Sequence, residues 1–321
     1  MRLLRYASLA GAALAGSVRR PRAPWKLTLA STWLCNHRCT HCRIWERRPD
    51  DELSSEELEL LFARNPSLRW LDLTGGEPTT RADLPDILRA ASRLLPQLVL
   101  LHFPTNGSLP DRAVAAARAA LEQPPPQVIL TVSLEGTRQV HEQMRGTPGA
   151  WDAAIETFAR LRELRGLSVV LGMTLTQANA GSARACFEEA RRALGRLERS
   201  EMHFNVAQES SHFYGNEGMA PASPEAVAAD LAFGATRSLH PTALLQRSYR
   251  ELVPRYLATG QSPIRCGSLA GSVYVDPQGT AYPCITEDRP LGNLRDLDYS
   301  LEALWRTTRD ARADVEAGRC T

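Results

Sequence analysis

Short apolar runs alternate with longer amphipathic segments between Leu27 and about Ala207. This alternation is typical of repeating βα units. The predicted strands cover residues 27–31, 68–74, 98–103, 128–133, 167–176 and 202–207. The predicted helices between them cover residues 54–64, 81–95, 110–122, 151–165 and 182–197.

Six successive βα units predict an α/β fold in which a parallel sheet with right-handed crossovers curls into a partial (βα)6 TIM-like barrel. Six units fall short of the eight that close a TIM barrel. Chemistry in such barrels takes place at the carboxyl ends of the strands. The unusual residues of this chain follow predicted strands, which places candidate chemistry at that end.

The segments that flank residues 27–210 have a different pattern. Residues 1–26 predict a helical extension that packs on the barrel. A secretory signal is the alternative, but Arg5 and Tyr6 interrupt the apolar run, which is also too short to span a membrane. Residues 211–262 predict a helical connection, with helices near 224–237 and 242–259. Residues 263–321 predict a small α+β module with a hairpin at 271–284 and a helix near 301–305.

Composition narrows the function classes only slightly. Of 321 residues, 38 are Lys or Arg and 36 are Asp or Glu, so no overall field attracts nucleic acid or an anionic membrane. The pattern of the seven cysteines fits metal binding in a reducing compartment better than disulfides, which predicts a cytoplasmic protein. Cys186 falls within a predicted helix and is interpreted as a core residue.

Three cysteines lie within eight residues directly after the first predicted strand. Cys35, Cys39 and Cys42 form a C-x3-C-x2-C loop. An iron–sulfur cubane takes cysteine thiolates, and one that only carries electrons normally takes four. Three ligands leave one iron open, and the amine and carboxylate of an amino acid can chelate it. The alternative is a zinc site completed by His37 or His41, because structural zinc takes four nitrogen or sulfur ligands.

This loop resembles the signature of the radical S-adenosylmethionine (radical SAM) superfamily. Asn36 matches a common variant, whereas His41 stands where many members have an aromatic residue. The resemblance implies a [4Fe–4S] cluster on Cys35, Cys39 and Cys42, with S-adenosylmethionine bound at the open iron.

Two further motifs at strand ends support the resemblance. Gly75, Gly76 and Glu77 resemble the GGEP motif, which implies contact with the amino group of the methionyl moiety. A simple tight turn is the alternative. Asn106, in a Thr-Asn-Gly sequence, is implied to lie near the cofactor ribose, and a plain Asn-Gly turn is the alternative.

The end of the fourth predicted strand carries a Ser-Leu-Glu-Gly sequence where many relatives have Ser-Leu-Asp-Gly, and an Arg-Gly pair follows it. The resemblance implies that Ser133 faces the ribose and that Arg145 pairs with the methionyl carboxylate. An ordinary loop salt bridge is the alternative for Arg145. Glu135 replaces the usual Asp, so its contact stays open.

The C-terminal segment resembles a SPASM or twitch module, which binds auxiliary iron–sulfur clusters. Cys266, Cys284 and Cys320 are the candidate ligands. Such modules have further cysteines after the final helix, but only Cys320 follows it here. Three interpretations remain: a truncated chain, an auxiliary site with three thiols, or a module without a cluster.

The resemblance implies an enzyme that takes one electron from an external flavodoxin or ferredoxin and cleaves S-adenosylmethionine to a 5′-deoxyadenosyl radical. That radical abstracts hydrogen from a peptide or small-metabolite substrate, leading to oxidation or cross-linking. Polar residues after the sixth predicted strand, among them Asn205, Gln208, His212 and Tyr214, are candidates to line the substrate site. The alternative is a non-catalytic iron–sulfur protein for electron transfer or redox sensing, against which the Gly-Gly-Glu motif argues.

Overall fold

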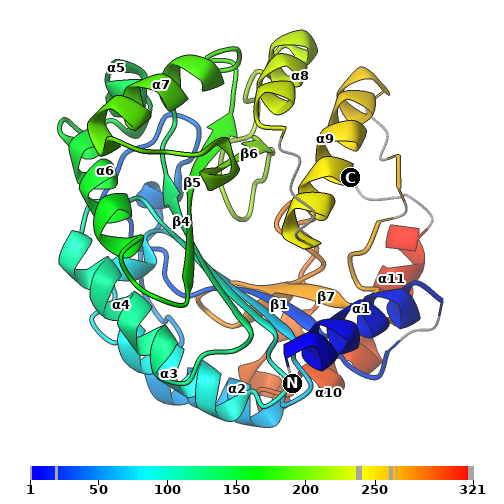
Figure 1. Ribbon diagram of the computed structural model, residues 1–321. Coiled ribbons are helices and arrows are strands. Elements are labelled where there is room, and N and C mark those ends of the chain that lie inside the picture. The colour runs from blue at the N-terminus through cyan, green and yellow to red at the C-terminus, as the bar shows by residue number, and fades with distance from the viewer. Residues whose placement is uncertain (1, 19–20, 236–240, 260–262, 265, 317–321) are drawn as a thin grey trace.

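The strands of the described chain form one continuous sheet in the order β6–β5–β4–β3–β2–β1–β7–β8–β9 (Figure 1). The computed structural model describes residues 2–18, 21–235, 241–259, 263–264 and 266–316. The strands are β1 (Lys26–Ala30), β2 (Trp70–Thr74), β3 (Leu100–Thr105), β4 (Gln127–Ser133), β5 (Leu167–Leu175), β6 (Met202–Val206), β7 (Ser272–Val275), β8 (Thr280–Tyr282) and β9 (Gly292–Asn293). Strands β1 to β6 are parallel, which confirms the predicted α/β class.

Helices cover the outer face of the curved sheet, and β6 and β9 form its two ends, so the barrel is open (Figure 1). The outer helices are α2 (Ser55–Arg64), α3 (Leu84–Leu94), α4 (Pro110–Glu122), α6 (Ala150–Leu161) and α7 (Ala183–Leu194). The other helices are α1 (Arg2–Val18), α5 (Arg138–Arg145), α8 (Pro224–Phe233), α9 (Pro241–Thr259), α10 (Leu301–Thr307) and α11 (Arg309–Glu316). Short 3-10 helices cover Ile44–Glu46, Pro78–Thr80, Arg199–Glu201 and Arg295–Leu297.

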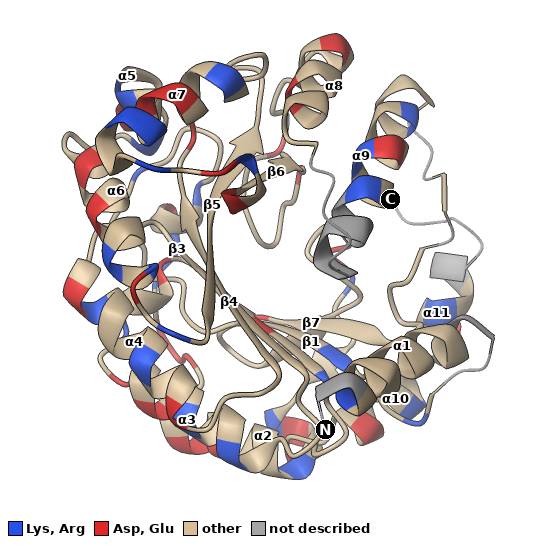
Figure 2. Ribbon diagram, in the orientation of Figure 1, with Lys and Arg blue, Asp and Glu red and all other residues tan. Residues whose placement is uncertain are grey.

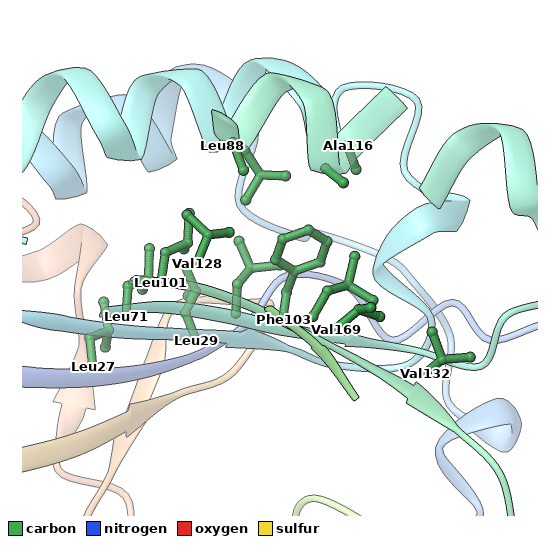
Figure 3. Close-up of a cluster of buried hydrophobic side chains, with 14 of the residues drawn as sticks. Leu27, Leu29, Leu71, Leu88, Leu101, Phe103, Ala116, Val128, Val132 and Val169 are labelled. Atoms are coloured by element: carbon green, nitrogen blue, oxygen red, sulfur yellow. The ribbon is translucent and has the colours of Figure 1, made fainter. Parts of the chain in front are cut away.

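The main hydrophobic core lies between the sheet and the outer helices. Alternate strand residues point outward, and side chains such as Leu71 and Phe103 are fully buried against Leu88 and Ala116 (Figure 3). Burial of one such leucine or phenylalanine contributes about 1.5–3 kcal/mol. The residues between them therefore face the inside of the barrel.

The N-terminal helix packs on the barrel, as predicted. The Tyr6 hydroxyl donates to Gln127 Oε1 of β4 at 2.9 Å, and Arg69 Nε donates to Ser8 Oγ at 3.0 Å. The described residues contain no helix that is both long and apolar enough to cross a membrane.

The segment after residue 263 extends the sheet of the barrel. Strand β7 pairs in parallel with β1, with Lys26 opposite Ser272, and β7 and β8 form the predicted hairpin. Helix α2 also contacts this segment, because Arg295 Nε donates to Glu57 Oε1 at 2.6 Å. The C-terminal segment is thus attached to the barrel at both β1 and α2.

Charge on the outer surface is mixed. Figure 2 shows acidic and basic residues interspersed along α3, α4 and α6. Arg89 pairs with Asp86 and Glu122, and Arg93 pairs with Glu59. This arrangement agrees with the near balance of charge in the sequence.

Candidate active site

The loop after β1 carries the three cysteines and lies against the turn after β2. Gly76 N donates to Thr32 O at 2.7 Å, and Glu77 N donates to Leu34 O at 2.8 Å. A Cβ atom on Gly76 would lie 2.4 Å from Leu34 O, and Gly75 has φ +134. The paired glycines are therefore required for the approach of the two backbones, and any larger residue would displace the cysteine loop.

Hydrogen bonds to the Glu77 side chain link the ends of β2 and β3. Its side chain is 1% exposed. Oε1 accepts hydrogen bonds from Thr79 N, Thr79 Oγ1 and Thr105 Oγ1 at 3.1, 2.5 and 2.8 Å, and Oε2 accepts from Asn106 N at 2.6 Å. Burial raises the pKa of this carboxyl, and the hydrogen bonds partly offset the rise. Both of its oxygens are committed to the protein itself.

Asn106 connects the end of β3 to the cysteine loop. Its Nδ2 donates to Asn36 Oδ1 at 2.8 Å, and Asn36 Nδ2 donates to Ser108 Oγ at 2.8 Å. Asn106 Oδ1 accepts from Ser108 N at 2.9 Å, an arrangement typical of an Asx turn. Asn36 is therefore a positioning residue for the loop, a role that the sequence alone did not reveal.

The three loop cysteines are free thiols inside the protein. Cys39 is buried, whereas Cys35 and Cys42 are half-buried. Burial raises the pKa of Cys35 to about 11 and that of Cys42 to about 12. Backbone hydrogen bonds from His37 and Ile44, each two residues after the cysteine, partly offset these rises. N–H groups aimed at sulfur are suited to a bound thiolate.

Helix α5, which the sequence did not predict, also contacts the cysteine loop. Thr40 N and Arg38 N donate to the carbonyls of Met144 and Arg145 at 2.8 and 3.1 Å. These carbonyls lie at the end of the helix, where they have no partner within it. Gly146 follows in the left-handed conformation, with φ +61. N–H groups of the cysteine loop therefore provide the hydrogen-bond partners that the carbonyls at the end of α5 would otherwise lack.

Arg145 lies beside Cys39 and forms a buried ion pair. Its side chain contacts Glu135 Oε1 at 2.5 Å and Cys39 Sγ at 3.5 Å. Glu135 Oε2 also accepts from Thr174 N of β5 at 2.8 Å. Ser133, at the end of β4, has a half-buried side chain.

Several imidazole nitrogens near the loop are buried without a hydrogen-bond partner. Both ring nitrogens of His37, Nδ1 of His41 and Nε2 of His141 are in this state, as is Nε of Arg145. Burial lowers the pKa of His37 to about 4 and that of His141 to about 2, so these rings are neutral at pH 7. Unpartnered buried donors beside sulfur ligands suit a group that itself offers acceptor sulfurs.

The zinc alternative requires four ligands around one ion. The described residues contain no group of three or more His, Cys, Asp and Glu side chains arranged to hold a single metal ion. A cubane takes its cysteines at separate iron atoms, so its ligands are spread around a larger group. The described residues therefore do not form a zinc site completed by His37 or His41.

An aromatic cluster separates the cysteine loop from the C-terminal hairpin. Trp33, Phe213 and Tyr274 are buried, and Cys35 and Cys42 pack against them. The His212 ring lies 4.5 Å from the Tyr282 ring, and its Nε2 lies 3.1 Å from the carbonyl oxygen of Cys284. Of the polar residues predicted near the substrate, His212 and Tyr214 belong to this region, whereas Asn205 and Gln208 are exposed.

A polar row crosses the inner face of the barrel. Lys26 Nζ lies 2.8 Å from Asp72 Oδ2, and Asp72 Oδ1 lies 2.8 Å from His102 Nδ1. His102 Nε2 lies 2.9 Å from Thr131 Oγ1. Because a carboxylate only accepts, Nδ1 of a neutral His102 carries the proton and Nε2 accepts from Thr131. Burial raises the pKa of Asp72, but Lys26 and His102 outweigh it and keep this pKa well below its usual range.

The two described cysteines of the C-terminal segment have a common local structure. Ser268 N donates to Cys266 Sγ, and Thr286 N donates to Cys284 Sγ, both at 3.4 Å. Ser268 Oγ donates to Pro283 O at 2.5 Å and so connects the two turns. Cys320 lies outside the described residues. Cys186 is fully buried in α7, which confirms its prediction as a core residue.

Known proteins share sequence similarity with this chain. Residues 31–179 match the model of the radical SAM superfamily. Over these residues, a little under half of its length, the chain is similar to the radical SAM superfamily. Among curated relatives, it is 30% identical over 174 residues to Fe-coproporphyrin III synthase of Methanosarcina barkeri, a match to 53% of this chain and 41% of that protein. It is 29% identical over 161 residues to mycofactocin maturase MftC of Mycobacterium tuberculosis, covering 49% of this chain and 39% of the relative.

The fold of this chain also resembles solved structures. The structure of anSMEcpe with bound AdoMet and a Kp18Cys peptide superimposes with a TM-score of 0.59 and 16% identity, over 89% of this chain and 82% of the other. At this identity the similarity concerns the fold alone, which confirms the partial barrel. This chain covers about two fifths of the length of the curated relatives that it matches.

The family uses a [4Fe–4S] cluster and S-adenosylmethionine. The residues of the cysteine loop fit the cluster. Three free thiols with N–H donors, unpartnered imidazole nitrogens and a buried guanidinium suit a sulfur-rich cluster. The loop that carries them joins the strand ends where radical SAM chemistry is expected.

Proposed function

We propose that this chain is an enzyme that reductively cleaves S-adenosylmethionine and abstracts hydrogen from a peptide or small-metabolite substrate. The observation that carries this proposal is the loop with Cys35, Cys39 and Cys42, anchored on the Gly-Gly-Glu turn and on the end of α5. In this proposal the three thiolates hold the cluster and leave one iron open. When bound there, the cluster supplies the electron that divides S-adenosylmethionine into methionine and a 5′-deoxyadenosyl radical.

The turn after β2 binds the methionyl ammonium in this proposal. Glu77 is occupied by Thr79, Thr105 and Asn106, so the ammonium is received by backbone carbonyls of the turn that Glu77 holds in place. Gly75 and Gly76 let that backbone lie directly against the cysteine loop, which keeps the turn beside the proposed cluster. Glu77 thus acts on the cofactor through the turn.

The remaining cofactor contacts come from the next strand ends. Asn106, which connects β3 to the cysteine loop, and Ser133, at the end of β4, are assigned to the ribose. Arg145 Nε, which is buried and unpartnered, is available to the methionyl carboxylate. These assignments combine the family motifs with the positions of the residues.

The substrate binds inside the barrel in this proposal. Lys26, Asp72, His102 and Thr131 give the inner wall a connected set of polar groups. Such groups suit a substrate with hydrogen-bonding atoms, such as a peptide backbone or a polar metabolite. The names of relatives support this range, since one is a maturase and one solved neighbour holds a peptide.

An auxiliary cluster in the C-terminal segment is a further part of this proposal. Cys266 and Cys284 each accept an N–H from the residue two positions later, as Cys35 and Cys42 do. Cys186, in contrast, is enclosed in the core. This shared pattern supports Cys266 and Cys284 as metal ligands in this proposal, with Cys320 as the third candidate ligand.

The electron comes from an external one-electron donor of the flavodoxin or ferredoxin type, and the protein acts in the cytoplasm. Both assignments follow from the chemistry of a cluster that must be kept reduced. Acidic and basic residues are interspersed and paired on the outer surface, so the proposal includes no nucleic-acid partner.

Anaerobic assay of 5′-deoxyadenosine tests this function. The reconstituted protein, reduced with dithionite and mixed with S-adenosylmethionine, is expected to form 5′-deoxyadenosine, which is quantified by mass spectrometry. Cys39→Ala should abolish this product, whereas Cys186→Ala, a matched buried cysteine, should retain it. Equal product from the protein and from Cys39→Ala would refute the proposal.

A further inference from the structure

We propose that Arg145, held by Glu135, tunes the reduction potential of the cluster through Cys39. This inference rests on the proposed function, because it assumes that Cys39 is a cluster ligand. In this role Arg145 contacts the sulfur, and Glu135 is a positioning residue that acts through Arg145.

The guanidinium of Arg145 is held between Cys39 and Glu135. Arg145 lies 3.5 Å from Cys39 Sγ and 2.5 Å from Glu135 Oε1. Arg145 is 8% exposed and Glu135 is 1% exposed, so water screens neither charge well. Glu135 is itself held by Thr174 N at 2.8 Å. The pair is thus attached to β5 at one end and to the cysteine at the other.

The main chain also holds Arg145 in place. Its carbonyl accepts from Arg38 N, in the same loop as Cys39, at 3.1 Å. Gly146 follows with a Cβ position that would lie 2.7 Å from Arg38 O. The end of α5 and the cysteine loop are therefore in direct contact, so the distance from guanidinium to sulfur is set by backbone packing as well as by Glu135.

The two charges act on the sulfur with opposite sign. The positive guanidinium of Arg145 contacts Cys39 Sγ, and the negative carboxylate of Glu135 contacts that guanidinium. Reduction of a cluster adds an electron, so a nearby cation stabilises the reduced form and a nearby anion opposes it. Hydrogen bonds to the sulfurs and local net charge set the potentials of iron–sulfur clusters. Arg145 is closer to Cys39 and therefore has the larger effect.

Potentiometric titration followed by electron paramagnetic resonance tests the inference without substrate or turnover. The full-length protein is prepared in a Cys266→Ala/Cys284→Ala background, so that only the loop cluster gives a signal, and S-adenosylmethionine is left out. Arg145→Gln is expected to reduce the ratio of reduced to oxidised cluster about tenfold at fixed potential, which is about 59 mV for a one-electron couple. Glu135→Gln should shift the potential the opposite way, to more positive values.

Two further variants separate charge from structure. Arg145→Lys keeps the cation and should stay closer to the parent potential than Arg145→Gln. Arg138→Gln removes an exposed guanidinium of the same helix, paired with Asp152, and should leave the potential unchanged. If Arg145→Gln does not retain iron, the sign of the shift in Glu135→Gln decides the question, and Arg145→Lys, which keeps the cation, should shift less than Glu135→Gln.

Shifts of the same sign in Arg145→Gln and Glu135→Gln, or no shift in Glu135→Gln, would overturn the inference. A purely structural role would lower iron content in these variants without opposite shifts in potential. Absence of any cluster in the parent protein would instead refute the proposed function. The two failures are therefore distinguishable.

Discussion

Glu77 shows how a motif residue can serve a cofactor site without facing the ligand. Its two oxygens accept four hydrogen bonds from three residues at the ends of β2 and β3. A buried carboxylate is stable only when such donors surround it. The turn, and with it the position of the cysteine loop, depends on this acceptor.

Glu77→Gln should destabilise the fold, because the amide places donor hydrogens against donors that are already there. We expect the free energy of unfolding to fall by about 2–3 kcal/mol, as for loss of a buried charged hydrogen-bond acceptor. Urea denaturation of the apoprotein measures it. Glu59→Gln, at an exposed pair with Arg93, should cost less than about 1 kcal/mol. Equal effects of the two changes would contradict this role for Glu77.

At the residue scale, sequence identified the thiols but not their neighbours. Cys35, Cys39 and Cys42 are close in the chain, so spacing alone could group them. Thr174 and His141 come from other elements and reach this region only in the folded barrel. The sequence cannot predict the interaction of Glu135 with Arg145 for the same reason, because a loop ion pair and a cofactor contact have the same sequence pattern.

At the element scale, the decisive contact is that between the turn after β2 and the loop after β1. There is no room for a side chain at Gly76, because an added Cβ atom would lie 2.4 Å from Leu34 O. Gly11 in α1 has nothing within 4 Å of its Cβ position and serves as a control.

Gly76→Ala should displace the cysteine loop and reduce the iron bound after reconstitution to less than half that of the parent protein. Gly11→Ala should bind the parent amount of iron. Alanine fits this exposed helix position and stabilises the helix by roughly 1 kcal/mol relative to glycine. Iron analysis with protein quantification checks both. Full iron incorporation in Gly76→Ala would show that the loop does not need this contact.

The strands of the barrel were predictable, whereas one helix and one strand pairing were not. Each of β1 to β6 overlaps a predicted apolar run, and the capping box of Ser54 and Glu57 begins α2 as expected. Helix α5 was missed because it is short, mostly polar and held in place by the cysteine loop. Pairing of β7 with β1 joins residues far apart in sequence, and hydrophobic periodicity indicates the face of a strand but not its neighbour.

At the scale of the whole molecule, Glu57 joins α2 to the C-terminal segment. Arg295 Nε donates to its Oε1 at 2.6 Å, and the Tyr299 hydroxyl donates to the same atom at 2.7 Å. The hydrogen bond from Arg295 lowers the pKa of Glu57 to about 2. This lowered pKa means that the interaction stabilises the fold above about pH 4.5 and is lost as the pH falls toward 2.

Glu57→Gln should reduce stability near neutral pH by about 1–2 kcal/mol, a value discounted because water reaches the pair. The difference from the parent should shrink as the pH falls from about 5 to 3. Urea midpoints of the apoprotein across that range measure it. Glu302→Gln, at an exposed pair with Arg306 in α10, should show little pH-dependent difference. A deficit for Glu57→Gln that stays constant with pH would contradict this account.

The proposed function depends on a cluster with three protein ligands and one accessible iron. Electron paramagnetic resonance of the reduced protein, with Cys266 and Cys284 replaced by alanine, tests this most directly when S-adenosylmethionine is titrated in. We predict a cubane signal whose shape changes on addition of S-adenosylmethionine and which is absent in Cys39→Ala. A cubane signal that does not respond to saturating S-adenosylmethionine would contradict the account.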